Sequence, residues 1–430
     1  GYLFLFQVKI SLLPGLFPLR TSMNKAVFFL AALGASTALC ASIPAENAEK
    51  RDTIPIARVP DVPPPSRETL DASIRKAADF LLKEQNRDGS WGSHTRTKGL
   101  NVICPYPEGP RSFRTASTSL CVIGLLTSPL KEDPAVKAAL DKAVQYLLTT
   151  LPTLKRGDTR TVLGVWGHAY GLSALSRAAR NLPADSPLYA ELKKVAGLQV
   201  KALDQMADVQ GGWGYYTFET FSKRPIGEPT SFLTATVLLA YKDSEQAFGL
   251  KPDARVVKRA VACLEKLRTP AGSYVYSLSH SFYPGRPINR HTGSLARTPA
   301  GDLALMRYDP AFISRRQLED GLERIWSRGG WLSLAVKKPI PHESFAQNAG
   351  YFFYYGYYYA ARCLEEVAPE HLARHASHLA SDLLPMQEKD GSWWDYPLYN
   401  YHKFYGTGYA LYAVSRVRES LYPSNAATAS

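Results

Sequence analysis

The chain has 430 residues, of which 45% are hydrophobic, and its mean hydropathy of −0.20 is typical of a soluble protein with a large core. Its formal net charge of +13 favours anionic partners such as acidic polysaccharides or lipid headgroups, although a solvated basic surface would carry the same charge. No dense basic run or nucleic-acid signature accompanies this charge, so nucleic acid is not expected as a partner.

The first 42 residues contain the features of an export signal. Lys25 precedes an apolar run over residues 26–39, and the small residues Cys40, Ala41 and Ser42 follow. This order is typical of a secretory signal peptide, and the run is too short for an ordinary membrane span. We therefore expect an upstream segment and signal peptide over residues 1–42, and an exported protein in the periplasm or outside the cell. An uncleaved N-terminal anchor is the alternative.

A polar, proline-rich segment follows over residues 43–65 and includes Pro63-Pro64-Pro65. Such a composition favours extended backbone without a core of its own. The segment is predicted to be a linker between the export signal and the folded part.

A turn made of glycine and an aromatic residue recurs about every sixty residues. From Trp213 the turns fall at Tyr274, Trp331 and Trp393, at spacings of 61, 57 and 62, and Trp91 lies 122 residues before Trp213. A period of this length indicates stacked supersecondary units. Six such units fill residues 66–423, and residues 424–430 are predicted to be a disordered tail.

Each unit is predicted to be a pair of helices. The first helix is amphipathic, and we expect it at 74–82, 140–148, 195–206, 256–267, 318–325 and 372–384. The second is rich in small and aromatic residues and poor in charge, as in buried helices, and we expect it at 115–126, 166–178, 231–241, 294–306, 351–364 and 405–417. Amphipathic helices outside a ring of buried ones make an all-α fold, an (α/α)6 toroid of six helical hairpins.

The pattern around two of the turns is specific. Residues 76–92 read Lys-Ala-x-x-Phe-Leu-Leu-x-x-Gln-x-x-Asp-Gly-x-Trp-Gly, and residues 384–393 repeat the core of that pattern with Gln387 and Trp393. The motif resembles the glutamine–tryptophan repeat of squalene and oxidosqualene cyclases, whose toroid superfamily includes the β subunits of protein prenyltransferases. On physical grounds we expect the tryptophan to pack between hairpins and the glutamine to bond the end of the next helix.

The chemical motifs of these families are missing from the chain. No Asp-x-Asp-Asp cluster is present, although the cyclases protonate their substrate with such a motif. Where prenyltransferases have zinc ligands, a comparison by position finds Asn348, Gly350 and Gly406, none of which anchors zinc. The resemblance thus implies the scaffold, and we expect no metal or other cofactor.

Cysteines give a weak indication of structure. If the compartment is oxidising, Cys104 and Cys121 could form a disulfide, whereas Cys263 and Cys363 lie in apolar helical runs and are expected to be small core residues.

The starts of the inner helices should surround one mouth of the toroid, so polar residues there are the candidates for a site. As catalytic residues we predict His168, Arg290, His291, Tyr355, Tyr401 and His402. As substrate-binding residues we predict Arg114, Glu228, Glu343, Asn348, Tyr351 and Tyr405. Each of them could instead cap a helix or bond a loop.

The segment 351–359 contains six tyrosines on all sides of one inner helix. Phenylalanine would suffice for packing, and buried hydroxyls need partners, so some of these tyrosines should face a polar cavity. Such a lining suits sugar rings or contacts with a carbocation.

Three functions remain open. The first is a cyclase- or prenyltransferase-like enzyme acting on an isoprenoid-like substrate. The second is a polysaccharide lyase-like carbohydrate enzyme, with Tyr or His exchanging protons and Arg neutralising a uronate. The third is a non-catalytic binding toroid. The expected partner is a small hydrophobic or carbohydrate ligand in the central cavity of a monomer, with a membrane surface as a further possible partner.

Overall fold

The structure, a computed structural model, describes residues 56–99, 102–104, 107–158, 160–180, 182–219 and 222–423. Over these residues the chain is helical, with 14 α-helices and no strands beyond isolated bridges. The predicted signal peptide at 1–42, most of the linker and the tail at 424–430 lie outside the described residues.

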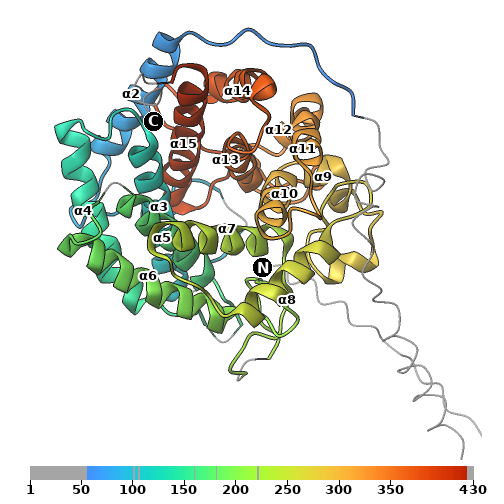
Figure 1. The fold of residues 1–430 in the computed structure, drawn as a ribbon, viewed down its shortest axis with the longest axis horizontal. Coiled ribbons are helices and arrows are strands. Elements are labelled where there is room, and N and C mark those ends of the chain that lie inside the picture. Colours follow the sequence, from blue (N-terminus) through green and yellow to red (C-terminus); the bar gives the residue numbers. More distant parts are fainter. Residues whose placement is uncertain are drawn as a thin grey trace, which may run out of the picture. The chain divides into compact units, whose positions relative to one another are not determined.

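Six helices form an inner ring around the centre (Figure 1). Each one packs against the next along the chain, and the last returns to pack against the first, which confirms the predicted toroid. The inner helices are α3 (Glu108–Thr127), α5 (Gly164–Ala179), α7 (Ser231–Phe248), α10 (Arg297–Tyr308), α13 (Phe353–Cys363) and α15 (His402–Leu421).

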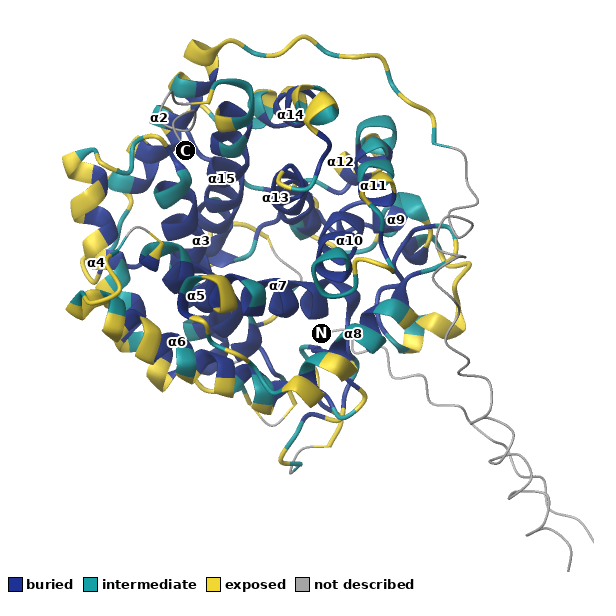
Figure 2. Cartoon of the chain, in the orientation of Figure 1, coloured by how far each residue is buried: buried dark blue, intermediate teal, exposed yellow. Residues whose placement is uncertain are grey.

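Six further helices lie outside this ring. Each has a buried stripe facing inward and an exposed outer side, whereas the inner helices are buried nearly all round (Figure 2). Ser66, Asp133, Ser186, Asp253 and Ser314 cap five of them at the N-terminus through their side chains. The outer helices are α2 (Arg67–Lys83), α4 (Pro134–Thr150), α6 (Pro187–Met206), α8 (Ala254–Leu267), α11 (Arg315–Arg328) and α14 (Pro369–Leu383).

The ring closes where α15 meets α3, and glycines permit the approach. A Cβ atom added to Gly408 would lie 2.6 Å from the backbone carbonyl carbon of Leu120, and one added to Gly124 would lie 2.9 Å from the carbonyl oxygen of Gly408. Both distances are below any ordinary contact, so a larger residue at either position would push the two helices apart.

The glycine-aromatic turns fasten outer helices to inner ones. The indole N–H groups of Trp91, Trp213 and Trp393 donate to carbonyl oxygens of the preceding outer helix at 2.8, 2.9 and 3.0 Å. Their backbone N–H groups donate to threonine hydroxyls on the following inner helix at 3.0 to 3.1 Å. Gly89 and Gly391 in these turns have left-handed backbone, with φ of 85° and 88°, as the predicted helix stop requires.

Two details differ from expectation. The Gln85 and Gln387 amides donate to the carbonyls of Ala139 and Ser73, which lie inside the neighbouring outer helices rather than at their ends. They thus link adjacent outer helices side by side.

Trp331 falls in a short helix, α12 (Gly330–Ser333), and is 36% exposed, because Gly329 and Gly330 do not adopt the left-handed turn that buries the other tryptophans.

The Cys104–Cys121 disulfide that an oxidising compartment would allow is not formed. Both thiols are buried and free, and the Cys121 Sγ lies 3.4 Å from the carbonyl oxygen of Phe404 on α15. Cys121 therefore serves the packing of α3 against α15, and Cys263 and Cys363 are small buried core residues as predicted.

Residues 56–65, the described part of the predicted linker, form no helix or strand and lie against the folded part. Arg374 of α14 donates to the carbonyl oxygen of Val59 at 2.8 Å and pairs with Asp61, and Tyr422 donates to the carbonyl of Pro65 at 2.9 Å. These contacts fix the entry of the chain into α2.

Candidate functional site

An aromatic cavity of about 280 Å³ opens at the mouth where the inner helices begin. Fourteen of its 22 lining residues are aromatic, and none of the 22 is Asp, Glu, Lys or Arg. The inner helices α3, α5, α7, α13 and α15 contribute side chains from their first halves, among them Phe113, Trp166, Tyr170, Phe232, Tyr355 and Tyr409. The predicted gathering of helix starts around one mouth therefore produces a largely apolar chamber.

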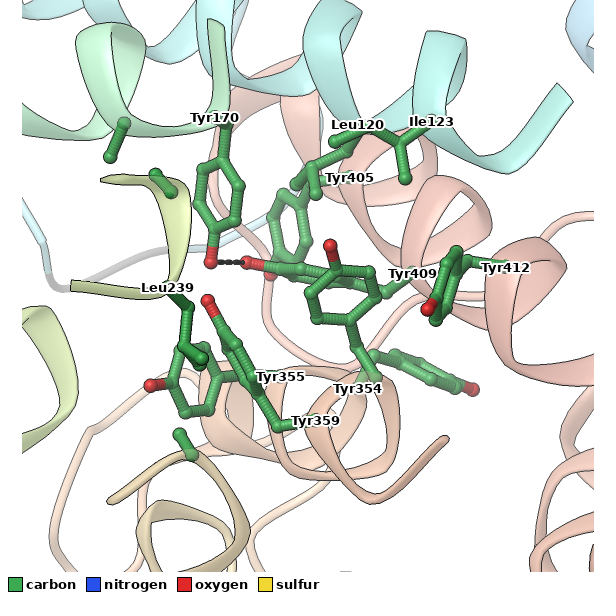
Figure 3. Packing of buried hydrophobic residues seen from close by; sticks show 14 of the residues in the cluster. Leu120, Ile123, Tyr170, Leu239, Tyr354, Tyr355, Tyr359, Tyr405, Tyr409 and Tyr412 are labelled. Atoms are coloured by element: carbon green, nitrogen blue, oxygen red, sulfur yellow. Dashed lines mark hydrogen bonds between the residues drawn. The ribbon is translucent and has the colours of Figure 1, made fainter. Parts of the chain in front are cut away.

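Tyrosines from α5, α13 and α15 gather beside this cavity (Figure 3). Tyr170 of α5 and Tyr409 of α15 share a hydrogen bond between their hydroxyls. Tyr355 donates to the carbonyl oxygen of Phe232 at 2.9 Å, and Tyr359 lies deeper, with its hydroxyl 3.0 Å from that of Thr236. Because these hydroxyls bond to one another, to Thr236 or to the backbone, they hold the rings in place and leave the aromatic faces of Tyr170, Tyr355 and Tyr409 to line the cavity.

One cavity-wall tyrosine is backed by a buried acid. Tyr405 donates to Asp395 Oδ1 at 2.7 Å, and the backbone N–H of Tyr354 donates to Asp395 Oδ2 at 3.0 Å. Asp395 is 0% exposed, and burial raises its pKa to about 7 although both hydrogen bonds oppose the shift. The hydrogen bond to Tyr405 thus places an ionisable group with a raised pKa directly behind the cavity wall.

A buried cation lies directly behind the cavity wall. Arg297 is 1% exposed, and its guanidinium carbon lies 5.5 Å from the ring centres of both Tyr276 and Phe352, which line the cavity. Its hydrogen bonds go to the backbone carbonyls of Gly293, Tyr274 and Ile288. Burial lowers its pKa to about 10, so the group stays charged at neutral pH.

A second, polar chamber of about 310 Å³ adjoins the first. Tyr215, Tyr216 and Tyr276 line both chambers, and the hydroxyls of Tyr215 and Tyr276 are 2.7 Å apart at this shared wall. The second chamber adds the ionisable side chains of Glu228, His280, Arg286 and His342. An apolar compartment therefore borders directly on a charged one.

Glu228 is held by a cluster of donors. Its Oε1 accepts from the hydroxyls of Ser277 and Ser279 and lies 3.4 Å from His280 Nδ1. Burial by itself would raise the pKa of Glu228, but the hydrogen bonds from His280, Ser277 and Ser279 outweigh it and lower the pKa to about 2. Glu228 is thus an anion whose charge the protein already compensates.

His342 connects the two chambers. Its Nδ1 lies 2.7 Å from the carbonyl oxygen of Gln347, so Nδ1 carries the proton, and Nε2 accepts from the Tyr351 hydroxyl at 3.0 Å. Burial lowers the pKa of His342 to about 4, which keeps the imidazole neutral. His342 and Gln347 have φ of 63° and 55°, a conformation that costs energy for residues other than glycine and is frequent at functional sites.

Five of the twelve predicted site residues line a chamber. Tyr351, Tyr355, Tyr401 and Tyr405 line the aromatic cavity, and Glu228 lines the polar one. Tyr351 and Tyr355 lie just before and within α13, and Tyr401 and Tyr405 lie at the start of α15. Glu228 lies in the loop before α7. The structure thus brings together the predicted aromatic residues.

The other predicted catalytic residues lie outside both chambers. His168 faces the outer helix α6, with Nδ1 2.6 Å from Gln199 Oε1. His402 Nδ1 bonds to the carbonyl of Tyr399 at 2.5 Å, and its ring packs edge-on to Trp394. Arg290 is exposed and donates to the carbonyl of Gly285 at 2.8 Å, and His291 lines neither chamber.

The remaining predicted binding residues have structural surroundings. Asn348 is buried and donates to the carbonyls of Thr292 and Trp331 at 2.8 and 3.2 Å. Arg114 lies 3.9 Å from Asp88 in an outward-facing pair, and Glu343 is exposed. These three residues thus fit the alternative interpretation given above, in which they belong to loops or to the surface and not to a binding site.

Sequence reasoning missed His280, Arg286, Arg297, His342 and Asp395. Four of them lie outside the α-helices, where no helical period marks them, whereas Arg297 begins α10 inside the predicted inner helix at 294–306 and was passed over as one charged residue of a buried helix. Asp395 was detectable in principle, because it follows the Trp393 turn by two residues and precedes the predicted start of an inner helix.

Within the described residues, no group of three His, Cys, Asp or Glu side chains is placed to hold a metal ion. Likewise, none of the helices found there combines the length and apolarity needed to cross a membrane.

Comparison with known proteins shows the fold. No protein-family model matches the sequence, and the search of curated proteins gave no match. Among solved structures, cellobiose 2-epimerase from Spirochaeta thermophila is similar with a TM-score of 0.54 and 13% identity, over 83% of this chain and 97% of that one. Unsaturated glucuronyl hydrolase from Streptococcus agalactiae follows with a TM-score of 0.52 and 12% identity, over 84% and 98%.

A type II terpene cyclase from Scytonema is also similar, with a TM-score of 0.47 and 13% identity, over 83% of this chain and 100% of that one. That score is too low to carry an argument. The two structures above 0.5 show that the described chain has the α/α toroid fold, and identities near 13% extend the likeness no further than the fold.

Proposed function

We propose that the protein binds an isoprenoid-like ligand in the aromatic cavity and acts on it there. The observation that carries this proposal is the lining: fourteen aromatic residues and no charged one around about 280 Å³. A cavity of this kind stabilises a ligand by removing apolar surface from water and by contact of its double bonds with aromatic faces.

A carbohydrate ligand is supported less well by the same cavity. Sugar hydroxyls need free donors and acceptors, but the hydroxyls of Tyr355, Tyr401 and Tyr405 already donate to Phe232, Pro110 and Asp395. Arg290, which was predicted to neutralise a uronate, lines neither chamber. We therefore keep the carbohydrate enzyme as an outcome of the test.

Isothermal titration calorimetry with geraniol and farnesol, and in parallel with cellobiose and galacturonate, tests the proposal. Isoprenoid binding with a negative heat-capacity change is expected, since apolar surface is buried. The variant Ala116→Phe should weaken binding by about tenfold or more, because the added ring fills the space of several methylene groups worth about 0.8 kcal/mol each.

The same substitution at the exposed Ala135 of α4 is the matched control and should leave binding unchanged. Circular dichroism and the melting temperature would verify that both variants fold. Binding of the sugars without binding of the isoprenoids would refute the proposal and favour the carbohydrate enzyme.

We further propose that the protein acts after export. The apolar run at 26–39 behind Lys25 supports this location. Expression with a C-terminal tag, followed by fractionation and N-terminal sequencing, should find mature protein beginning close to residue 43 outside the cytoplasm. Full-length protein confined to the cytoplasm would contradict export.

A further inference from the structure

We propose that the ligand is amphipathic and that its anionic head group, a carboxylate or a phosphate monoester, sits in the polar chamber next to Arg286. This inference rests on the proposed function, because the aromatic cavity holds the apolar body of the same ligand.

The two chambers are placed to hold the two ends of one molecule. They share Tyr215, Tyr216 and Tyr276, and their volumes of about 280 and 310 Å³ each suit a part of a small ligand. At the shared wall the hydroxyls of Tyr215 and Tyr276 lie 2.7 Å apart and bond to each other. Because one of these two hydroxyls donates to the other, a head group on the polar side can accept from the hydroxyl whose hydrogen remains, while the body stays among the rings.

The charge near this wall is positive. Arg297 has backbone carbonyls as its hydrogen-bond acceptors, and among the described residues no carboxylate forms an ion pair with it. A buried cation without an anion is costly, and the field that it sets up is screened little by solvent. The 5.5 Å between its guanidinium and the Tyr276 ring brings that field to the border of the chambers.

Arg286 adds a second cation inside the polar chamber. Its guanidinium carbon lies 4.6 Å from the ring centre of Tyr283, and in the described part of the chain it has no ion pair. The carboxylate of this chamber, Glu228, is already bonded to Ser277 and Ser279 and faces His280. Serine hydroxyls stabilise the charge of Glu228 without cancelling it, so the two arginines and this one carboxylate together leave one net positive charge, which an anionic head would neutralise and a cationic head would oppose.

Three ligands with the same hydrocarbon body, geraniol, geranic acid and geranyl phosphate, separate the contribution of the head group to binding from that of the body. Calorimetry at low salt should show both anions binding about tenfold or more tightly than geraniol, since a charge-assisted hydrogen bond to arginine is gained. The gain should shrink as salt is added, because Arg286 is exposed. A preference between carboxylate and phosphate identifies which head the chamber takes.

Arg286→Gln should remove this gain and leave geraniol affinity within about twofold, since geraniol makes no contact that needs the charge. Arg290→Gln is the matched control, because Arg290 is an exposed arginine four residues away that lines neither chamber. Equal affinities for all three ligands, or a gain that survives in Arg286→Gln, would overturn the inference while the proposed function stands. Failure of geraniol and both anions to bind would overturn the proposed function itself. Tight binding of inorganic phosphate without any of the three would overturn both.

Discussion

Asp395 gives the sharpest test of the energetics of the site. It is 0% exposed, and it accepts hydrogen bonds from the Tyr405 hydroxyl and the Tyr354 backbone. In Asp395→Asn the amide oxygen can keep the bond from Tyr354, while the amide N–H donates to the Tyr405 oxygen. The Tyr405 hydroxyl can then turn to the Tyr396 carbonyl, 3.3 Å away. The variant therefore removes the ionisable group and retains the packing.

The expected magnitude follows from the pKa of Asp395, which burial raises from 3.8 to about 7. The folded state then holds this proton more tightly than the unfolded state does. The protein loses stability as pH rises from about 4 to about 7, and no further loss occurs above that range. Three pH units at about 1.4 kcal/mol each give about 4 kcal/mol in total, of which about 2.5 kcal/mol falls between pH 5 and pH 8.

Urea unfolding of the native protein and of Asp395→Asn at pH 5, 6, 7 and 8 measures this effect. The variant should become more stable relative to the native protein by about 2.5 kcal/mol between pH 5 and pH 8, and other titrating groups cancel in the comparison. A difference between the two proteins that does not change with pH would show that Asp395 has an ordinary pKa, and the reasoning about its burial would be wrong.

Two further predictions concern the scaffold. Gly408→Ala places a Cβ atom 2.6 Å from the Leu120 backbone, so chemical denaturation should show a loss of about 1–3 kcal/mol, whereas Gly285→Ala, with nothing within 4 Å of its added Cβ, should change stability little. Equal effects of the two substitutions would contradict the account of ring closure. Trp393→Phe removes the indole donor to the last carbonyl of α14 and should lower the free energy of unfolding by about 1–3 kcal/mol. Trp331→Phe, at a 36% exposed position, should lower it by less than about 0.5 kcal/mol. A larger loss in Trp331→Phe than in Trp393→Phe would count against the role of the buried turns.

The fold could be predicted because its rules are local and repeated. Each hairpin carries its own amphipathic helix, its own turn and its own buried helix, so the sixty-residue period alone indicates the architecture. The predicted inner helix at 231–241 is confirmed within α7 (Ser231–Phe248), and the predicted outer helix at 256–267 within α8 (Ala254–Leu267). Some helices begin before their predicted starts, because a capping residue such as Asp133 begins the helix ahead of the hydrophobic pattern from which the start was predicted.

The candidate site was predicted only in part, for a geometric reason. A residue at the start of an inner helix can face the cavity or the outer ring, because each step along a helix turns the side chain by about 100°. His168 faces outward to Gln199, whereas Tyr170, two residues later, faces the cavity. His342 lies in an irregular loop, and only its contacts with Tyr351 and Gln347 show its position. Of the six tyrosines at 351–359, Tyr351 and Tyr355 line the cavity, which is largely apolar rather than polar as predicted, and the other four are packed in the core.

The way the ring closes has a consequence for biosynthesis. Because α15 packs against α2 and α3 of the first hairpin and against α13 of the fifth, the apolar surfaces of these helices lack their final neighbour until α15 has left the ribosome. A growing chain would present those surfaces to chaperones or to aggregation partners for most of its synthesis. Translocation of an unfolded chain is compatible with this late step, and shortening the protein within α15 would prevent assembly of the whole ring rather than of one repeat.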